Sequence, residues 1–441
     1  MRVDSHKSNP LWSGGEWKLS RSEVESLYLN FDSESATSIL PKLGPLERVF
    51  SNFIENERSL TPLDDGELIA LFDSCTDPNQ HVPDIIAALR KLAPGKGHVG
   101  FRQVNTLISH LRQRVHWHAE KNNLDLDLLP HDDTFGSGGD YSKTMHATTA
   151  AAIIVAPKVT ICKTGTTNVT SPHGSTHFIA ELGYKETANL DTVNRQLREH
   201  GFAYVSLATL GFPYSTGLKA ARMAIWVDAM DKLREYQMKN LDPQQVLPTL
   251  DITLDIFKVV SPNARVLDPV HHSTGVSHLS MIPYVLATYL FSDADHEHRG
   301  QTGVISHCYC GIDEISNAGS DAMRGLPNNL VVRVEREEIV VAEFSPEDVG
   351  MRRVGLMEIS SHATLAHEVK SFWNVLLGEE RGAIRDFLAV NAALLLIAGK
   401  ATTSNQSFVS QLRAAIQEVQ IELLEMGLAY RNLVDLLHHS V

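Results

Sequence analysis

Hydrophobic residues in the first quarter of the chain recur at the spacing of an α-helix. Residues 1–40 are polar and rich in serine, and we expect them to form a loosely packed extension. Beyond them, one helical face carries five apolar side chains, namely Leu46, Val49, Phe50, Phe53 and Ile54. The same spacing predicts helices over 85–92 and 104–111. Thr61 and Pro62 predict the start of another helix, with the threonine as its N-cap.

From about residue 128 the pattern changes to short apolar strands that alternate with helices. Segment 148–156 is small and apolar and predicts a tightly packed helix, and 159–162 predicts a short buried strand. Further strands are predicted at 202–207, 303–307 and 331–334. Further helices are predicted from 179, over 218–239, over the uniformly apolar 391–399, and from 408 into the tail. This alternation indicates an α/β domain with a mainly parallel central sheet.

The 441 residues are enough to bury a large core and to form two domains. The predicted fold class is α/β, with a small all-helical N-terminal domain and a larger α/β domain. We expect a polar extension over 1–40, a helical domain over 41–125 and an α/β domain over 126–441. Helices from 180–250 are candidates to complete the helical domain.

Composition and charge narrow the classes of partner. The chain is 43% hydrophobic and 21% charged, as expected of a globular protein, and its net charge is −14. That charge disfavours nucleic acid and anionic membranes as general partners. The sequence contains no run of eighteen apolar residues, and residues 1–18 have no apolar core. We therefore expect no membrane span, no signal peptide and a cytoplasmic location.

Four cysteines in so long a chain do not make a disulfide framework, which favours a reducing compartment. Two of them form the sequence Cys308-Tyr-Cys310, which is not a CxxC pair. On a strand their thiols would point the same way. Buried structural cysteines are the first interpretation, and a redox or metal role is the alternative.

The segment from Phe135 to Asp140, with the sequence FGSGGD, is the first candidate for chemistry. Its glycines let the backbone approach a ligand, and inward N–H groups would bind an anion together with the N-terminus of the helix that begins near residue 148. Nearby hydroxyls could donate to phosphate oxygens, those of Thr144, Thr148 and Thr149. A tight turn without a ligand is the alternative for the glycine motif alone.

Two further motifs follow predicted strands. Lys163 begins a hydroxyl-rich loop, KTGTTNVTS, at the carboxyl end of a strand, where ligands bind in open α/β sheets. Asp313 and Glu314 follow the strand at 303–307, and adjacent carboxylates suit Mg²⁺ that also binds substrate phosphates. The alternatives are a solvated lysine and an acidic pair at a helix start. Together the three motifs suit a phosphorylated sugar that carries a metal-bound diphosphate.

In order and spacing, these motifs resemble those of anthranilate phosphoribosyltransferase and its relatives, a fold group that includes the pyrimidine nucleoside phosphorylases. GSGGD at 136–140 is similar to the family's GTGGD loop, and GIDEIS at 311–316 is similar to its metal motif. HGS at 173–175, FSPEDVG at 344–350 and the segment 378–400 resemble three further family motifs. The resemblance covers about residues 45–425.

The resemblance implies a binding site for phosphoribosyl pyrophosphate in the α/β domain, with Mg²⁺ as cofactor. It implies catalytic roles for Lys163 and Asp140. The implied donor-binding residues are Gly136, Ser137, Gly138, Gly139, Asp140, Thr144, His146, Thr148, Thr149, Lys163, Thr166 and Ser175. The implied metal-binding residues are Thr148, Asp313 and Glu314. Relatives dimerise through the helical domain, so the resemblance also implies a homodimer, with Val49, Phe50 and Phe53 as candidate interface residues or, alternatively, internal ones.

The chain departs from the family pattern at several positions. His146 replaces the family's asparagine, and KTGTT at 163–167 replaces KHGNR. The family segment that supplies the acceptor-binding arginine has no counterpart, and residues 213–262 stand in its place. The part of the site that would bind phosphoribosyl pyrophosphate is therefore predicted from more residues than the part that would bind the acceptor.

The first functional hypothesis is a Mg²⁺-dependent phosphoribosyltransferase that transfers 5-phosphoribose to a small, aromatic acceptor and releases pyrophosphate. Positioning and charge stabilisation would provide much of its rate. A nucleoside phosphorylase is an alternative that would not need the pair Asp313 and Glu314. A non-catalytic relative that binds a nucleotide or a nucleic acid is another, and the altered loops are its motivation.

Overall fold

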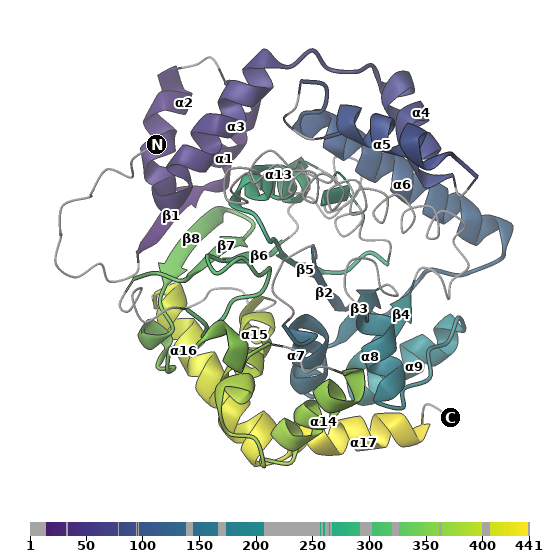
Figure 1. Ribbon diagram of the computed structural model, residues 1–441, viewed down its shortest axis with the longest axis vertical. Coiled ribbons are helices and arrows are strands. Elements are labelled where there is room, and N and C mark those ends of the chain that lie inside the picture. The colour runs from purple at the N-terminus through teal and green to yellow at the C-terminus, as the bar shows by residue number, and fades with distance from the viewer. Residues whose placement is uncertain are drawn as a thin grey trace, which may run out of the picture.

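The computed structural model describes residues 15–31, 34–77, 79–93, 95, 97–137, 144–165, 173–206, 256, 259–260, 264, 267–291, 302–319, 326–360, 364–398 and 406–439. Eight strands of this part of the chain form one sheet, in the order β1-β8-β7-β6-β5-β2-β3-β4 (Figure 1). Helices cover both faces of the sheet. The predicted α/β fold class is thereby confirmed.

Five neighbouring strands of the sheet are parallel. They are β6 (Thr302–Cys308), β5 (His271–Gly275), β2 (Asp132–Gly136), β3 (Ile161–Gly165) and β4 (Phe202–Ser206). Three antiparallel strands extend the sheet beyond β6: β7 (Asn329–Val334), β8 (Glu338–Phe344) and β1 (Glu16–Ser20). The carboxyl ends of the five parallel strands therefore meet at one edge, as predicted for the ligand site.

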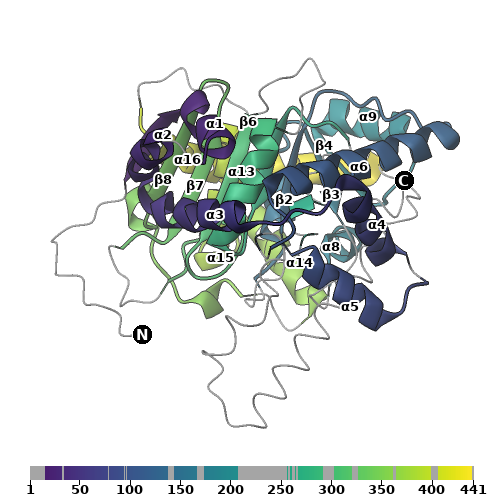
Figure 2. The same cartoon turned by 90° about the horizontal axis from the view of Figure 1, so that it is seen from above.

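The N-terminal helices gather on one face of the sheet, together with α13 (Figure 2). They are α1 (Arg21–Leu29), α2 (Glu34–Ile39), α3 (Glu47–Ser59), α4 (Asp65–Thr76), α5 (Val82–Lys91), α6 (Phe101–Lys121) and α13 (Ile282–Phe291). The structure thus has the predicted helical N-terminal segment. The division of the chain into domains stays a prediction.

The other face carries helices from the second half of the chain and two from the first half. They are α7 (Ala147–Val155), α8 (Ser175–Glu181), α14 (Leu365–Leu376), α15 (Ala383–Ala398), α16 (Phe408–Glu418) and α17 (Leu428–His439). Helix α9 (Leu190–His200) packs against the edge strand β4 and against α17. No helix in the described ranges is long and apolar enough to cross a membrane.

Alternate strand residues enter two separate cores. In β7, Leu330 and Val332 pack with the N-terminal helices, whereas Val331 packs with α14–α16 on the opposite face. In β8, Val341 and Ala342 divide in the same way. This division follows from the two-residue period of a strand, which turns successive side chains to opposite faces. Both faces are buried, which explains the continuous apolar runs in these strands.

The structure corrects two expectations about the N-terminal part. Residues 16–29 do not form a loose extension, because β1 pairs with β8 and Leu19 is buried. Ser20 then caps α1 by accepting a hydrogen bond from the Glu23 N–H group at 3.3 Å. The predicted helix start at Thr61 is also wrong, because Asp64 is the N-cap of α4 and accepts from the Glu67 N–H group at 3.0 Å.

The proposed interface residues Phe50 and Phe53 face the interior of the chain. Their side chains are 0% and 3% exposed, and their rings lie 5.9 and 5.3 Å from the ring of Tyr28. They therefore stabilise the core on the N-terminal side of the sheet and are not available to a second subunit. The helix predicted over 218–239 lies outside the described residues.

Candidate active site

The last residues of β2, β5 and β6 bring the glycine motif and the acidic motif together. Gly136 is in register with Gly275, and Gly275 is in register with Ser306. The next residue, Ser137, donates its N–H to the Gly275 carbonyl at 2.9 Å, and its hydroxyl oxygen accepts from the Ser277 N–H at 3.2 Å. The backbone N–H of Ser137, which was predicted to bind donor, thus continues the pairing of these strands.

Two glycines make room for Asp313. A Cβ atom on Gly136 would lie 2.6 Å from Asp313 Oδ2, and one on Gly275 would lie 2.2 Å from the Asp313 carbonyl oxygen. The hydroxyl of Ser306 donates to the same carbonyl at 3.1 Å. The predicted metal-binding carboxylate is thus buried against the first glycine of the GSGGD motif, although the two residues are far apart in sequence.

A turn after β6 sets the direction of the acidic pair. Gly311 has a φ of 89° and donates its N–H to the Cys308 carbonyl at 2.9 Å, and Cys308 donates its N–H to the Ile312 carbonyl at 3.2 Å. A positive φ favours glycine at this position. The turn sends the chain back across the sheet edge, so that Asp313 and Glu314 lie there, both buried.

Glu314 and Thr148 line one small cavity between the sheet, α7 and α15. Its volume is about 20 Å³, and Ser273, Ser306 and Asn391 also contribute to its wall. A space of this size holds about one water molecule. Thr148, a predicted metal ligand, therefore lines the same cavity as Glu314. The adjacent Thr149 is 1% exposed and does not line this cavity.

Lys163 was predicted to follow a strand, but it is the central residue of β3 and its side chain is buried. Its Nζ atom donates to the carbonyls of Thr134 at 2.6 Å and Thr164 at 3.0 Å, and lies 5.4 Å from the centre of the Phe135 ring. Burial lowers the pKa of Lys163 below its ordinary value, while the negative charge of Asp133 and of the acidic pair acts in the opposite sense. The ammonium group thus contributes positive charge from beneath the site.

Asp133 is a residue of the site that the sequence did not single out. Its carboxylate accepts from the Thr164 hydroxyl at 2.9 Å and from the Thr164 N–H at 3.3 Å. Burial raises the pKa of Asp133, and the charge of Lys163 opposes that rise. A buried carboxylate beside a buried ammonium joins β2 to β3. Two consecutive aspartates just before the glycine motif were the signal that could have indicated it.

His146 precedes α7 and has both ring nitrogens engaged. Nδ1 lies 2.7 Å from Glu368 Oε1, and Nε2 lies 3.2 Å from the His173 carbonyl oxygen. The His146 N–H also donates to Glu368 Oε1 at 2.6 Å, and the ring stacks on Phe178. His146 therefore links α7, α8 and α14.

Ser175 belongs to a group of hydroxyls beside the last residue of β3. Its Oγ atom lies 2.9 Å from the Tyr204 hydroxyl, which lies 2.9 Å from the Thr176 hydroxyl as well. A Cβ atom on Gly165 would lie 2.3 Å from both Ser175 Oγ and the Tyr204 hydroxyl oxygen. Gly165 thus lets the end of β3 approach this group closely.

The other predicted site residues are distributed as follows. Thr144 forms an isolated antiparallel bridge with Ser360. Gly138, Gly139, Asp140 and Thr166 lie outside the described residues. Among the described residues, no group of three or more histidine, cysteine, aspartate or glutamate side chains could hold a metal ion alone.

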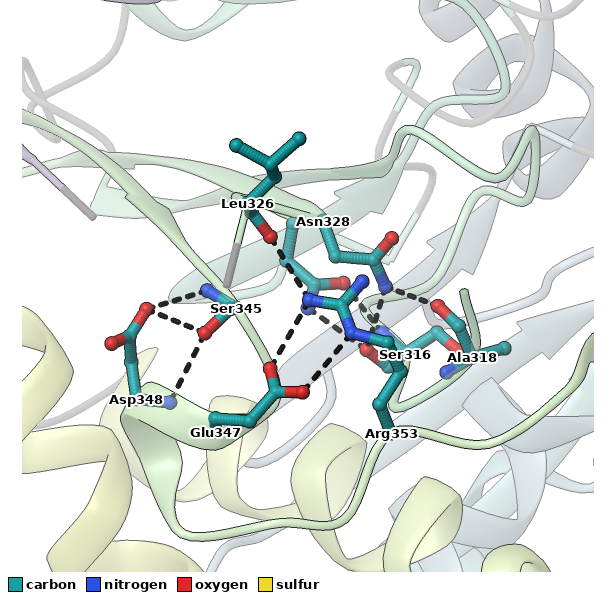
Figure 3. A network of polar contacts seen from close by, with 9 residues as sticks. Ser316, Ala318, Leu326, Asn328, Ser345, Glu347, Asp348 and Arg353 are labelled. Atoms are coloured by element: carbon teal, nitrogen blue, oxygen red, sulfur yellow. Dashed lines mark hydrogen bonds and ion pairs between the residues drawn. The ribbon is translucent and has the colours of Figure 1, made fainter. Parts of the chain in front are cut away.

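A polar network supports the segment that follows Glu314 (Figure 3). Arg353 donates to both carboxylate oxygens of Glu347, each at 3.1 Å, and to the Leu326 carbonyl at 2.9 Å. Asn328 donates to the carbonyls of Ser316 and Ala318. The FSPEDVG motif at 344–350 therefore contributes Glu347 to the support of the site.

Comparison with known proteins agrees with this arrangement. Residues 130–224 and 312–420 match a model described as a glycosyl transferase family, a/b domain. The chain is 23% identical over 302 residues to an anthranilate phosphoribosyltransferase of Pyrococcus abyssi, covering 68% of this chain and 79% of that protein. It is 25% identical over 351 residues to one of Cytophaga hutchinsonii, covering 77% and 90%.

Solved structures share the fold. The anthranilate phosphoribosyltransferase of Saccharomyces cerevisiae in complex with PRPP and Mg has a TM-score of 0.52 at 17% identity, covering 95% of this chain and 98% of that one. The enzyme of Thermus thermophilus has a TM-score of 0.53 at 21% identity, covering 84% and 99%. The match to the family model, the similar sequences and the shared fold agree with one another: the chain is similar in sequence and fold to the anthranilate phosphoribosyltransferases, and two of its segments match the glycosyl transferase a/b domain.

Proposed function

We propose that this protein is a Mg²⁺-dependent phosphoribosyltransferase. It would transfer 5-phosphoribose from phosphoribosyl pyrophosphate to a small, aromatic acceptor and release pyrophosphate. The observation that carries the proposal is the contact between the glycine motif and the acidic motif, where Gly136 leaves room for Asp313. The names of the relatives, anthranilate phosphoribosyltransferases, support the same reaction class.

The candidate metal ligands fit Mg²⁺ better than they fit a metal ion that is coordinated by protein side chains alone. Two buried carboxylates and a threonine hydroxyl are hard oxygen ligands, and Glu314 and Thr148 share one cavity. A site with only two carboxylates leaves coordination positions for water and for substrate phosphates. Asp313, Glu314 and Thr148 would hold the ion. When bound, Mg²⁺ supplies positive charge that stabilises the departing pyrophosphate.

The protein residues act mainly by position and charge. Pyrophosphate leaves C1 of the ribose with the electron pair of the broken C–O bond, and the acceptor nucleophile forms the new bond to C1. Lys163 adds a positive charge near the acidic pair, without a direct proton transfer, because its donors are directed at backbone carbonyls. The N-terminus of α7 adds a partial positive charge beside Thr148.

The acceptor proposal rests on fewer residues. Residues 225–311 lie between the two matched segments, and much of the stretch that replaces the arginine segment lies outside the described residues. We infer a small aromatic acceptor from the relatives' names, with anthranilate as the first compound to test. We also propose a homodimer that uses exposed positions of the N-terminal helices. A cytoplasmic location is a further proposal.

Calorimetric titration of phosphoribosyl pyrophosphate, with and without Mg²⁺, tests the proposal. We expect binding that depends on the metal and that is lost in the double variant D313A/E314A. The matched control is E337A/E338A, a carboxylate pair at the start of β8, at the opposite end of the sheet. Absence of binding to the folded wild-type chain in either condition would overturn the proposal in favour of the phosphorylase or the non-catalytic relative.

A further inference from the structure

Two thiols lie in contact at the turn that leads into the acidic motif. The sulfur atoms of Cys308 and Cys310 are 2.7 Å apart, compared with about 2.05 Å in a disulfide. Cys308 ends β6 and is buried, whereas Cys310 is half-buried. The sequence alone predicted only that two thiols on a strand would face the same way. The structure instead brings them together by a turn.

The turn holds this geometry through its backbone. Besides the two hydrogen bonds that close it, between Gly311 and Cys308 and between Cys308 and Ile312, Tyr309 donates its N–H to the Asn328 carbonyl at 2.9 Å. The Cys310 N–H also lies 3.4 Å from the Cys308 sulfur. Because the sulfurs already lie 2.7 Å apart, a small shift of the turn is enough to join them.

The two thiols are not equivalent in reactivity. The hydrogen bond from the Cys308 thiol lowers the pKa of Cys310, whereas burial raises the pKa of Cys308. A thiolate is the reactive form of cysteine, so the more accessible Cys310 is the one suited to attack. The other two cysteines differ: Cys75 is buried and donates to the Ile85 carbonyl, and burial raises the pKa of Cys162.

We propose that Cys308 and Cys310 form a reversible disulfide within the chain by exchange with a low-molecular-weight disulfide such as glutathione disulfide. The Cys310 thiolate attacks one sulfur of glutathione disulfide, and one glutathione leaves as its thiolate. Cys308 then attacks the Cys310 sulfur of the mixed disulfide and displaces the second glutathione. Two electrons pass from the protein to glutathione, and the two thiol protons are released to the glutathione products.

The modification also has a consequence for the acidic motif, and this part rests on the proposed function. Asp313 is three residues after Cys310, and its carbonyl is held by Ser306. Drawing the sulfurs to covalent distance shifts the turn between Cys308 and Ile312. We therefore expect oxidation to weaken Mg²⁺-dependent binding of phosphoribosyl pyrophosphate, by about threefold or more, the equivalent of a distortion of about 0.7 kcal/mol.

The test uses the folded full-length chain, reduced and then equilibrated in buffers of varied reduced and oxidised glutathione. Free thiols are trapped with N-ethylmaleimide in acid denaturant, and peptides are analysed by mass spectrometry. We expect a peptide linked between Cys308 and Cys310, two hydrogens lighter than the reduced form and restored by reduced glutathione. Cys75 and Cys162 should stay reduced, which provides an internal control.

Two variants separate the steps. C310S should abolish the reaction with glutathione disulfide, and C308S should accumulate a glutathione adduct on Cys310. Persistent free thiols at every buffer ratio, or a stable glutathione adduct in the wild-type chain, would overturn the proposed disulfide. If the disulfide forms and donor affinity is unchanged, the coupling to the acidic motif is wrong. If neither form binds donor, the proposed function fails while the disulfide stands.

Discussion

Gly136 and Asp313 are in contact across the sheet edge, such that any side chain at position 136 would meet the Asp313 carboxylate. A Cβ atom there would lie 2.6 Å from Oδ2, a separation that real Cβ atoms essentially never show. The carboxylate or the end of β2 must then move, at a cost of about 1–3 kcal/mol. The glycine is therefore needed for space, and the contact defines where the two motifs of the site meet.

The variant G136A should weaken Mg²⁺-dependent binding of phosphoribosyl pyrophosphate by about tenfold or more, because about 1.4 kcal/mol corresponds to one decade. Titration calorimetry measures this loss directly. The matched control is G355A, since a Cβ atom there would meet only Glu358 Oε1 at 3.7 Å, an ordinary contact. Wild-type affinity in folded G136A would show that Asp313 does not need its observed position.

Arg353 and its neighbour Arg352 provide a paired test of the network in Figure 3. The Arg353 side chain is 3% exposed and binds Glu347 through two nitrogen atoms, whereas that of Arg352 is 73% exposed in its pair with Glu358. A lysine cannot reproduce a bidentate contact. R353K should therefore lower the free energy of unfolding by about 2 kcal/mol, and R352K by less than about 0.5 kcal/mol. Urea denaturation measures both, and equal effects would contradict a special role of the buried pair.

His146 occupies a position where relatives have asparagine, and its contacts indicate a structural task. Removal of the ring in H146A takes one hydrogen bond from the buried Glu368 carboxylate and the stacking contact from Phe178, so the free energy of unfolding should fall by about 2 kcal/mol. H146N retains a donor and should lose about half as much.

If His146 acts through Glu368, H146N should change donor affinity less than G136A does. Thermal or urea denaturation and donor titration on the same preparations separate the two effects. A large loss of donor affinity in H146N at unchanged stability would instead support the direct donor contact that the family resemblance implies.

Stability should fall as the pH rises from about 4 to about 7. Burial raises the pKa of Glu57 to about 7 and that of Asp132 to about 7, so the folded chain holds protons that the unfolded chain releases earlier. Their contribution is fully present below the unfolded pKa and is lost as the pH rises through the folded pKa. Each group contributes up to about 1.4 kcal/mol per pH unit in this window.

The variants E57Q and D132N should each flatten this dependence and should be more stable than the wild type at pH 8. Chemical denaturation at a series of pH values measures the slope. E55Q, which changes an exposed residue of the same helix as Glu57, serves as the control. Unchanged slopes in both E57Q and D132N would mean that these carboxyl groups titrate normally in the folded protein.

Strand β3 was predicted at 159–162, two residues before its observed start, and the apolar strand β8 was not predicted at all. Strands β4, β6 and β7 were predicted close to their observed bounds, because both faces of the sheet are covered by helices. Strands β2 and β5 were not, since DDTFG and HHSTG look like loops. Their polar side chains are buried among one another, as Asp133 and Thr164 are, and such pairing depends on tertiary contacts that local sequence does not report.

The positions of site residues could be predicted where a motif stands at the end of a strand. The hydrogen-bond partners of long side chains could not be predicted in the same way. The positions of Gly136, Asp313 and Glu314 follow from motifs at strand ends. The partners of Lys163 and His146 could not be predicted, because they are a carbonyl of a neighbouring strand and a carboxylate on α14. Only the folded arrangement brings these acceptors within reach.

The pairing of β1 with β8 has a consequence for the folding of the chain during its synthesis on the ribosome. Glu16 pairs with Ala342, so the first strand emerges 326 residues before its partner, the difference of 342 and 16. At about 5–20 residues per second, that delay lasts about 15–65 s. During this time β1 has no strand to pair with, and Leu19, which is buried in the folded chain, lacks its final environment. The sheet can therefore gain its first strand only after synthesis has passed β8.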